Sequence, residues 1–289
     1  AANGEVVVSM DKLKAVGAVN VTDRSVTVGA GAITQSIQDA ASQVGLFYPV
    51  DFASSGSSQI GGNIATNAGG INVIRYGMTR DWVAGLTVVT GKGEVMALNK
   101  GLMKNNTGLD FRHLFIGSEG ILGFITEATL KLTAPPKNAT VLVLGLSDMD
   151  AIMRVLERIQ STASLLAYEF FSELAVSKVV EHAGVARPFD TQTPFYALIE
   201  FENDSERIEA ALFDAVEACM EEGWVIDAVM SQNVGQARAL WRLRADISET
   251  LTRWTPYKND ISATVGNVPE LLSRVDAVVH QHYPSWEVV

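Results

Sequence analysis

Residues 49–77 read PVDFASSGSSQIGGNIATNAGGINVIRYG and carry six glycines among small and amide side chains. Glycine opens backbone conformations that are closed to other residues and lets the chain approach another group closely. Two Gly-Gly pairs, 61–62 and 69–70, each lie near an asparagine, which predicts successive backbone N–H groups turned toward one anionic ligand. A flexible linker is the alternative, but the isoleucines and valine between the glycines favour burial. We therefore expect this stretch to hold a phosphate-bearing ligand.

Known phosphate-binding motifs do not account for the stretch. Gly56 and Gly61 have the spacing of a P-loop, but Gly62 stands where that loop requires lysine, which argues against a Walker ATPase. The dinucleotide fingerprint G-x-G-x-x-G is missing from the stretch. No Gly-x-Ser-x-Gly nucleophile elbow occurs there or around Ser118. The expected ligand is a large phosphorylated cofactor that is cradled by another backbone geometry.

Three runs of sequence together resemble the FAD-linked oxidases of the vanillyl-alcohol-oxidase type. They are QIGGNIATNAGG (59–70), RYGMTRDWVAGLTVVTGKGEV (75–95) and LFIGSEGILGFITEATLKL (114–132). The branch that they resemble most is the D-2-hydroxyacid dehydrogenases, which act on D-lactate, D-2-hydroxyglutarate or glycolate. This resemblance runs from about Val6 to the end of the chain. It implies FAD as the cofactor, whereas composition and spacing alone imply only a phosphate-bearing ligand.

The bulk properties exclude several classes of protein. The chain has 289 residues, which suits two domains that each bury a core. Its net charge of −11 argues against nucleic-acid binding, which needs a basic surface. No apolar run approaches the roughly 18 residues of a membrane span. The single cysteine, Cys219, is expected to be buried on a helix face, and we expect a reducing, cytoplasmic location.

Pro135-Pro136 marks the expected domain boundary, because two consecutive prolines break both helices and sheets. The resemblance implies that residues 1–136 form an α+β PCMH-type FAD-binding domain. We expect this domain to lack its N-terminal part, since the chain does not begin with Met and the family has a further phosphate-binding segment upstream. Residues 137–289 are expected to form the FAD-linked oxidase C-terminal cap domain, without its C-terminal part.

Hydrophobic periodicity predicts the local elements. Before the boundary we expect strands at 5–9, 16–21, 25–28, 82–90, 94–98 and 125–132, and a helix that starts at Thr34 and ends at Gly45. After the boundary we expect strands at 140–146, 165–171, 195–202 and 224–231, with helices at 148–161, 173–182, 204–222 and 234–254. This alternation after the prolines predicts a ferredoxin-like α+β layer.

The resemblance places the flavin contacts on two segments of the first domain. The pyrophosphate and ring side are implied at Pro49, Gly61, Gly62, Asn63, Asn67 and Gly70. The second segment is implied at Gly117, Glu119, Gly123 and Ile125, where a backbone amide near Ile125 would meet the adenine. Plain strand core is the alternative for Ile125, and a solvated or turn-stabilising carboxylate is the alternative for Glu119.

Arg244, Ser248 and Lys258 are the candidate substrate contacts. Arg244 and Ser248 are four residues apart and share one helix face, and Lys258 follows a turn with proline. An arginine can hold a carboxylate through two parallel hydrogen bonds. On spacing alone, a charged surface face of a helix is the stronger interpretation. The segment LWRLRADISETLTRWTPYKNDIS (240–262), however, resembles the family's substrate-binding stretch, with these residue types at the same spacing. Substrate selectivity stays open, because some members have threonine in place of Ser248.

The resemblance implies oxidation of a small-molecule D-2-hydroxy acid to the 2-oxo acid, with hydride transfer to the flavin. Two alternatives stay open: a flavin oxidase of an alcohol without a carboxylate, and a flavin-binding electron-transfer subunit. No catalytic base is identifiable, and the family's histidine-rich segment, which can bind a divalent metal, is expected beyond Val289. His280 and His282 point apart on a helix, so we expect no shared metal site there. The electron acceptor, and a homodimer or a partner subunit, also stay open.

Overall fold

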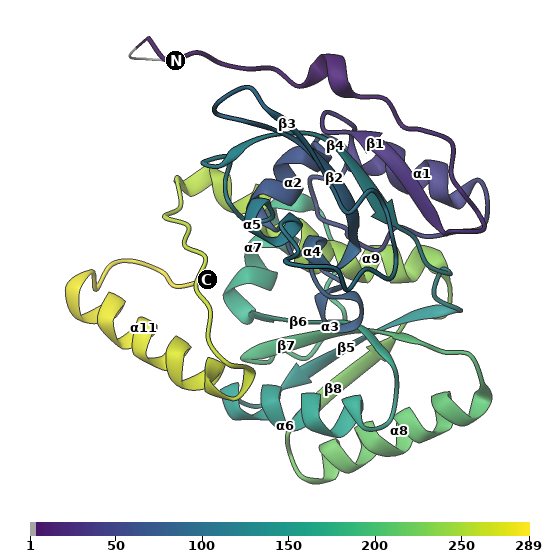
Figure 1. The fold of residues 1–289 in the computed structure, drawn as a ribbon. Helices are drawn as coiled ribbons and strands as arrows, with labels where there is room; N and C mark the ends of the chain where they lie inside the picture. Colours follow the sequence, from purple (N-terminus) through teal and green to yellow (C-terminus); the bar gives the residue numbers. More distant parts are fainter. Residues whose placement is uncertain (1–3) are drawn as a thin grey trace. The chain divides into compact units, whose positions relative to one another are not determined.

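The computed structural model describes residues 4–289 (Figure 1). The chain divides into two compact units, of which the first ends at Pro136 and the second begins at Lys137. Each unit contains its own four-stranded antiparallel sheet. The α+β fold class predicted from the sequence is confirmed.

The first unit has the sheet order β1-β4-β2-β3. Its strands are β1 (Ser25–Gly29), β2 (Val83–Thr90), β3 (Val95–Leu98) and β4 (Gly123–Lys131). Its helices are η1 (Asp11–Leu13), α1 (Thr34–Ser42), α2 (Ile60–Thr66), α3 (Val73–Tyr76), α4 (Thr79–Trp82) and α5 (Arg112–Phe115). The hairpin predicted between β2 and β3 is confirmed, with Val89 opposite Val95.

Alternation along the strands decides which face of the first sheet is buried. Val26 and Val28 of β1 are buried, because alternate residues of a strand point to the same face. They belong to one apolar core with Ile37 of α1 and with Ile60 and Ile64 of α2. The glycine-rich segment is therefore anchored in this core by two of its isoleucines, whereas Val73 and Ile74, which are also expected to be buried, are exposed.

The second unit has the sheet order β6-β7-β5-β8, which is 2-3-1-4 when its strands are counted along the chain. Its strands are β5 (Ala139–Leu146), β6 (Leu165–Ser172), β7 (Phe195–Glu202) and β8 (Val225–Met230). Its helices are α6 (Met149–Gln160), α7 (Glu173–Ala183), α8 (Glu206–Glu221), α9 (Val234–Ala245), α10 (Ile247–Thr250), η2 (Leu251–Trp254), η3 (Val265–Asn267) and α11 (Val268–His282). This order agrees with the predicted ferredoxin-like layer.

Helices cover both faces of the second sheet (Figure 1). One apolar core joins α6 and α8 to the sheet, and it includes Cys219, which is buried as predicted. A second core joins α7 and α9 to the opposite face, with Leu243 of α9 fully buried. Side-chain caps begin α6 and α9: Asp148 accepts from the N–H of Ala151 at 2.8 Å, and Asn233 accepts from that of Gln236 at 3.0 Å.

Three local predictions are wrong or partly wrong. Residues 5–9 form no strand, and their valines are exposed to solvent, since no other strand pairs with them in the part of the chain that the structure describes. In place of a strand at 16–21, Val16 and Asn20 form only isolated bridges with β1. The long helix expected at 234–254 is divided into α9, α10 and η2, and the first break lies at Asp246.

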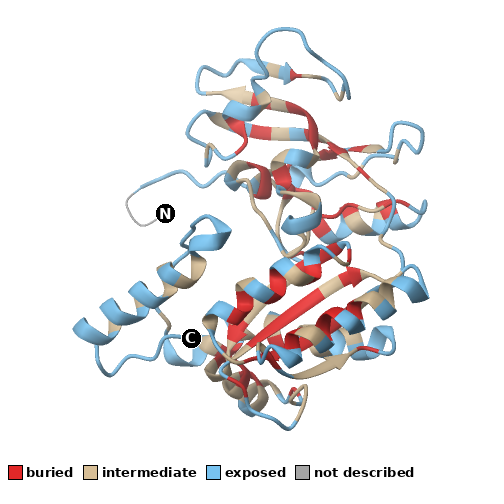
Figure 2. Cartoon of the chain, turned by 90° about the horizontal axis from the view of Figure 1, so that it is seen from below, coloured by how far each residue is buried: buried red, intermediate tan, exposed pale blue. Residues whose placement is uncertain are grey.

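Helix α11 contrasts with the helices that pack on the sheet. It has no buried residue, and its ribbon is coloured as exposed or intermediate in Figure 2. It remains within the second unit, where Glu287, a few residues after it, accepts a hydrogen bond from Lys178 of α7 at 2.6 Å. None of the helices described in residues 4–289 is long and apolar enough to cross a membrane.

Candidate functional site

The first glycine pair lies at the N-terminus of α2. The N–H of Gly61 donates to the carbonyl of Ala30 at 2.8 Å, and those of Gly62 and Asn63 donate to the carbonyl of Gln59 at 3.0 and 3.1 Å. The Gly61 donor is engaged because the start of α2 packs against the chain that leaves β1, and the other two are engaged in the first turn of the helix itself. The expectation that this pair turns successive N–H groups toward an anion is therefore not met.

The second glycine pair has different surroundings. Among residues 4–289, the N–H groups of Gly69 and Gly70 have no backbone or side-chain acceptor, and Gly70 is exposed. Gly70 has a φ of +89°, and a Cβ atom there would lie 2.3 Å from the carbonyl oxygen of Asp51. No residue with a side chain fits that position without strain. This pair, rather than the first, leaves backbone donors available to an anion.

Three of the other predicted cofactor contacts have polar groups that are used within the fold. Asn63 is buried, and its Nδ2 donates to Oγ1 of Thr34 at 2.8 Å. Asn67 ends α2 in a left-handed conformation, and its Oδ1 accepts the N–H of Arg80 at 3.0 Å. Pro49 is buried, and its carbonyl accepts a side-chain amide hydrogen bond at 3.0 Å. These groups position the segment.

The second predicted cofactor segment lies directly against α2. The N–H of Gly117 donates to the carbonyl of Ile64 at 3.0 Å, and the N–H of Glu119 donates to that of Ala65 at 2.8 Å. Gly117 and Glu119 are exposed and have φ angles of +83° and +52°. The fold therefore joins the two segments, which are far apart in the sequence, into one surface.

Arg80 also links the two segments, a role that its place in the sequence, next to Asp81 and so suited to an ion pair, does not predict. Its Nη2 donates to the carbonyl of Ile116 at 2.9 Å, and its Nη1 lies 3.0 Å from Nδ1 of His113. Because its own N–H binds Oδ1 of Asn67, Arg80 connects the C-terminal end of α2 to α5 and to Ile116, which follows α5.

Gly123 and Ile125 lie on β4. A Cβ at Gly123 would lie 2.5 Å from the carbonyl oxygen of Val89, so the close approach of two strands explains this glycine. The side chain of Ile125 belongs to the first core, which agrees with the alternative of strand core. The contact between its backbone and an adenine stays a prediction.

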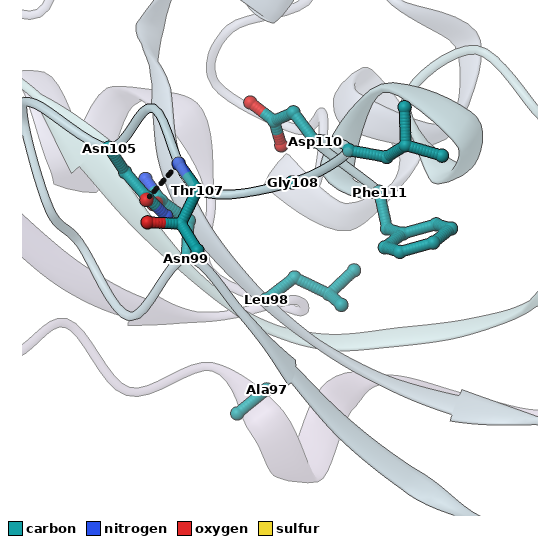
Figure 3. Close-up of a pocket in the computed structure, with 9 residues that line it drawn as sticks. Ala97, Leu98, Asn99, Asn105, Thr107, Gly108, Asp110 and Phe111 are labelled. Carbon is teal, nitrogen blue, oxygen red and sulfur yellow. Dashed lines mark hydrogen bonds between the residues drawn. The ribbon is translucent and has the colours of Figure 1, made fainter.

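A cavity of about 130 Å³ lies elsewhere in the first unit and is lined by residues between Ala97 and Phe111 (Figure 3). Its amide side chains bind other groups of the first unit, and Asn99 donates to the carbonyl of Ala84 on β2 at 2.7 Å. Asn105 donates to Oδ1 of Asn99 at 2.7 Å and accepts the N–H of Thr107 at 3.1 Å. These amides thus stabilise the loop, and we assign no ligand to the cavity.

Ser248 and Lys258, two of the predicted substrate contacts, touch each other in the second unit. The Nζ of Lys258 donates to Oγ of Ser248 at 2.8 Å and to its carbonyl at 3.0 Å. Both residues are exposed. A lysine ammonium has three N–H donors, so one remains for a ligand.

Arg244 lies near the C-terminal end of α9 and pairs with Glu169 of β6. The Nε of Arg244 donates to Oε2 of Glu169 at 2.6 Å. The two side chains are 37% and 21% exposed. Within residues 4–289, the Nη1 and Nη2 atoms of Arg244 have no acceptor, and no hydrogen bond joins Arg244 to Ser248 or Lys258. The terminal edge of the guanidinium is therefore free to hold a carboxylate.

Glu169 is not among the residues predicted from the sequence. It is the only charged residue in β6, whose sequence LLAYEFFS is otherwise apolar or uncharged. A carboxylate in such a strand needs a partner, because burying an unpaired charge is unfavourable. That signal was available in the sequence, but it does not say which cation is the partner.

No group of three histidine, cysteine or acidic side chains within residues 4–289 could hold a metal ion. His280 and His282 lie in the last turn of α11. The Nδ1 atom of His280 lies 2.9 Å from the carbonyl oxygen of Asp276 in the same helix.

Comparison with protein families gives two matches. Residues 1–99 match the FAD binding domain, and residues 135–289 match the C-terminal domain of FAD linked oxidases. D-2-hydroxyglutarate dehydrogenase of Stutzerimonas stutzeri is 57% identical over the whole chain, which spans 62% of that relative. The mitochondrial D-2-hydroxyglutarate dehydrogenase of Arabidopsis thaliana is 35% identical over 84% of the chain and 44% of its own length.

Solved structures share the fold at low identity. An alkyldihydroxyacetonephosphate synthase superimposes with a TM-score of 0.71 and 17% identity, over 94% of this chain and 53% of its own. A p-cresol methylhydroxylase superimposes with a TM-score of 0.64 and 14% identity, over 84% and 54%. At these identities the likeness concerns the fold alone.

Proposed function

Because the chain belongs to the FAD-linked oxidases, we propose that it is part of an FAD-dependent dehydrogenase that oxidises a D-2-hydroxy acid to the 2-oxo acid. The names of its relatives support this substrate class. The chain spans 62% of the first of these relatives, so the activity is proposed for the protein of which these residues form a part. The observation that carries the proposal is the open terminal edge of the Arg244 guanidinium.

The residues of the first unit fit a flavin nucleotide. The N–H groups of Gly69 and Gly70 are available to a phosphate group, and Gly70 occupies a position that only glycine fits. A Cβ at Gly62, in the first predicted cofactor segment, or at Gly120, in the second, would meet no atom within 4 Å. On both segments the backbone at a glycine is therefore open to a ligand. We assign the cofactor to this surface, where Arg80 holds the two segments together. When bound, FAD would supply the acceptor for the substrate hydride.

The second unit supplies the contacts for an anionic substrate. The terminal edge of Arg244 can bind a carboxylate through two parallel hydrogen bonds. The ammonium of Lys258, which the Ser248 carbonyl and hydroxyl hold in place, offers one further donor. These groups bind and orient the acid. A cytoplasmic location is proposed from the single free cysteine, Cys219.

The test of the function is the visible spectrum of the FAD-loaded protein during anaerobic addition of hydroxy acids. We expect D-2-hydroxyglutarate or D-lactate to bleach the flavin, whereas L-2-hydroxyglutarate, the matched control, leaves it oxidised. A flavin that neither D-acid bleaches contradicts the proposed substrate class. If vanillyl alcohol alone bleaches the flavin, the substrate is an alcohol without a carboxylate. If the flavin is bleached only when a partner subunit is present, the protein is an electron-transfer subunit.

Substitution of Arg244 tests the substrate contact separately. Arg244→Ala is expected to raise KM and to lower kcat/KM by roughly a hundredfold, because a charge-assisted pair of hydrogen bonds is lost. The control is Arg274→Ala, which removes an arginine from an exposed pair with Glu270 on α11. Steady-state kinetics with D-2-hydroxyglutarate provide the measurement. Equal kinetics for the two variants would contradict the assignment of Arg244.

A further inference from the structure

Two carboxylates on one face of the second sheet accept hydrogen bonds from helix α9. Glu200 of β7 lies opposite Ala167 of β6, which is two residues before Glu169, so Glu169 and Glu200 point to the same face. Trp241 Nε1 donates to Glu200 Oε1 at 3.3 Å, and Arg244, one turn later, donates to Glu169. Each carboxylate therefore binds a different residue of α9.

Apolar packing already fixes the helix backbone at this point. Leu243 is fully buried in the core that joins α9 to the sheet. The ion pair between Arg244 and Glu169 is partly exposed, and pairs of this kind add little to stability. A role in folding is therefore a weak explanation for a carboxylate in the middle of β6.

The geometry of the contact suggests a better explanation. Glu169 binds Arg244 through Nε and leaves Nη1 and Nη2 open. A long arginine side chain loses rotamer freedom when it grips a ligand, and a side chain that is already held loses less. A contact at Nε restrains the guanidinium without occupying its terminal edge.

We propose that Glu169 is a positioning residue, which holds Arg244 so that its terminal edge faces the carboxylate of the substrate. This inference rests on the proposed substrate class, because it names the residue that orients the guanidinium proposed to bind the substrate carboxylate. Glu169 acts only through Arg244, and Glu200, on the same face, has no part in substrate binding.

A double-mutant cycle tests the proposal in the FAD-loaded protein. Calorimetry gives the dissociation constant of 2-oxoglutarate for the wild type, Glu169→Ala, Arg244→Ala and the double variant. We expect Glu169→Ala to weaken binding roughly tenfold and the double variant to bind no more weakly than Arg244→Ala. Glu169→Gln keeps an oxygen acceptor for Nε and is expected to restore most of the affinity. Glu200→Ala, the matched control, removes a carboxylate from the same face and leaves the affinity unchanged.

Several results would overturn the proposal. They are unchanged or tighter binding in Glu169→Ala, an additive loss in the double variant, an equal loss in Glu200→Ala, and no 2-oxoglutarate binding by the wild type. Thermal unfolding of each variant separates lost positioning from lost folding, and a tenfold loss in Glu169→Ala with an unchanged Tm supports the proposal. If the wild type binds 2-oxoglutarate but oxidises neither D-acid, the proposed function fails and the cycle still decides the role of Glu169.

Discussion

The glycine-rich segment of the first unit and the substrate contacts of the second unit use different atoms. In residues 59–70 the groups that hold the segment are mainly backbone amides and carbonyls, and the amide side chains of Asn63 and Asn67 also bind within the unit. Arg244 and Lys258 instead project charged side chains, each with donors to spare.

This difference predicts how the two regions respond to substitution. A backbone site is formed by the fold, so an added side chain at a closely packed glycine disturbs folding before it disturbs binding. A side-chain site stands on a scaffold that is packed elsewhere, so its loss disturbs binding and leaves folding nearly unchanged. The comparison fails if substitutions in the first region change only affinity or substitutions in the second region change only stability.

Gly70→Ala is expected to have the largest effect on stability. The φ of +89° and the 2.3 Å approach of a Cβ to the Asp51 carbonyl oxygen combine backbone strain with overpacking. We expect a loss of about 2–5 kcal/mol in the unfolding free energy of the first unit. Chemical denaturation of the variant and the wild type measures it.

The matched control is Gly62→Ala, eight residues earlier in the same segment. A Cβ there meets no atom within 4 Å, and the residue lies in a helix, so we expect a gain of about 0.5–1 kcal/mol. If bare backbone at Gly62 faces the cofactor, the same variant binds FAD more weakly. Equal stability losses in both variants would argue against a specific steric requirement at Gly70.

The sequence predicts the fold well where periodicity and packing agree. In the second unit, strands and helices alternate with strong apolar patterns, and the predicted elements from 140 to 231 all form. The pattern fails at 5–9, because three adjacent valines indicate a strand only when another strand is present to pair with them. A local sequence pattern carries no information on whether a pairing strand is present.

The candidate site is less predictable, because its chemistry depends on which hydrogen-bonding groups remain unpaired. Gly61 and Gly70 look alike in the sequence, yet the N–H of Gly61 binds Ala30 and that of Gly70 has no acceptor within residues 4–289. The contact between Ser248 and Lys258 follows from short-range spacing. The pair of Arg244 and Glu169 joins distant parts of the sequence, and periodicity gives no information on it.

Acid unfolding provides a further contrast between the units, since the second unit contains a charged network that supports its fold. Glu173 accepts hydrogen bonds from Tyr196 at 2.6 Å, Ser177 at 2.6 Å and Arg187 at 2.7 Å. Partial burial acts to raise the pKa of Glu173, but these hydrogen bonds outweigh it and hold the pKa below its usual value of 4.5. The network therefore contributes its full stability above pH 4.5 and loses it as the pH falls through the lowered pKa.

We expect Glu173→Gln to lower the unfolding free energy of the second unit by about 2 kcal/mol at neutral pH and to remove this part of its acid sensitivity. Denaturation at a series of pH values measures both effects. The control is Asp110→Asn in the first unit. Its hydrogen bond from Arg112 also lowers the pKa of Asp110, but the carboxylate is 41% exposed, so its loss changes stability little. A larger effect at Asp110 would contradict the contrast between the units.

Two tyrosines, one buried and one partly buried, give the test with the smallest expected effect. The hydroxyl of Tyr48 in the first core has no hydrogen-bond partner among residues 4–289, and burial raises its pKa above the ordinary value. Tyr168 in the second unit donates to the carbonyl of Ile152 at 2.6 Å. We expect Tyr48→Phe to stabilise its unit by about 1 kcal/mol and Tyr168→Phe to destabilise its unit by about 1 kcal/mol.

Opposite signs for the same chemical change would show that the hydroxyl of Tyr48 is buried without a partner and that the hydroxyl of Tyr168 is stabilised by its partner. Thermal unfolding of both variants beside the wild type gives the two signs directly. A loss of stability in Tyr48→Phe would mean that the hydroxyl has a partner in solution, such as an ordered water, because removing an unpaired hydroxyl relieves a desolvation cost. The first unit would then satisfy its buried polar groups as fully as the second, and the contrast would be confined to the exposed donors of Gly69 and Gly70.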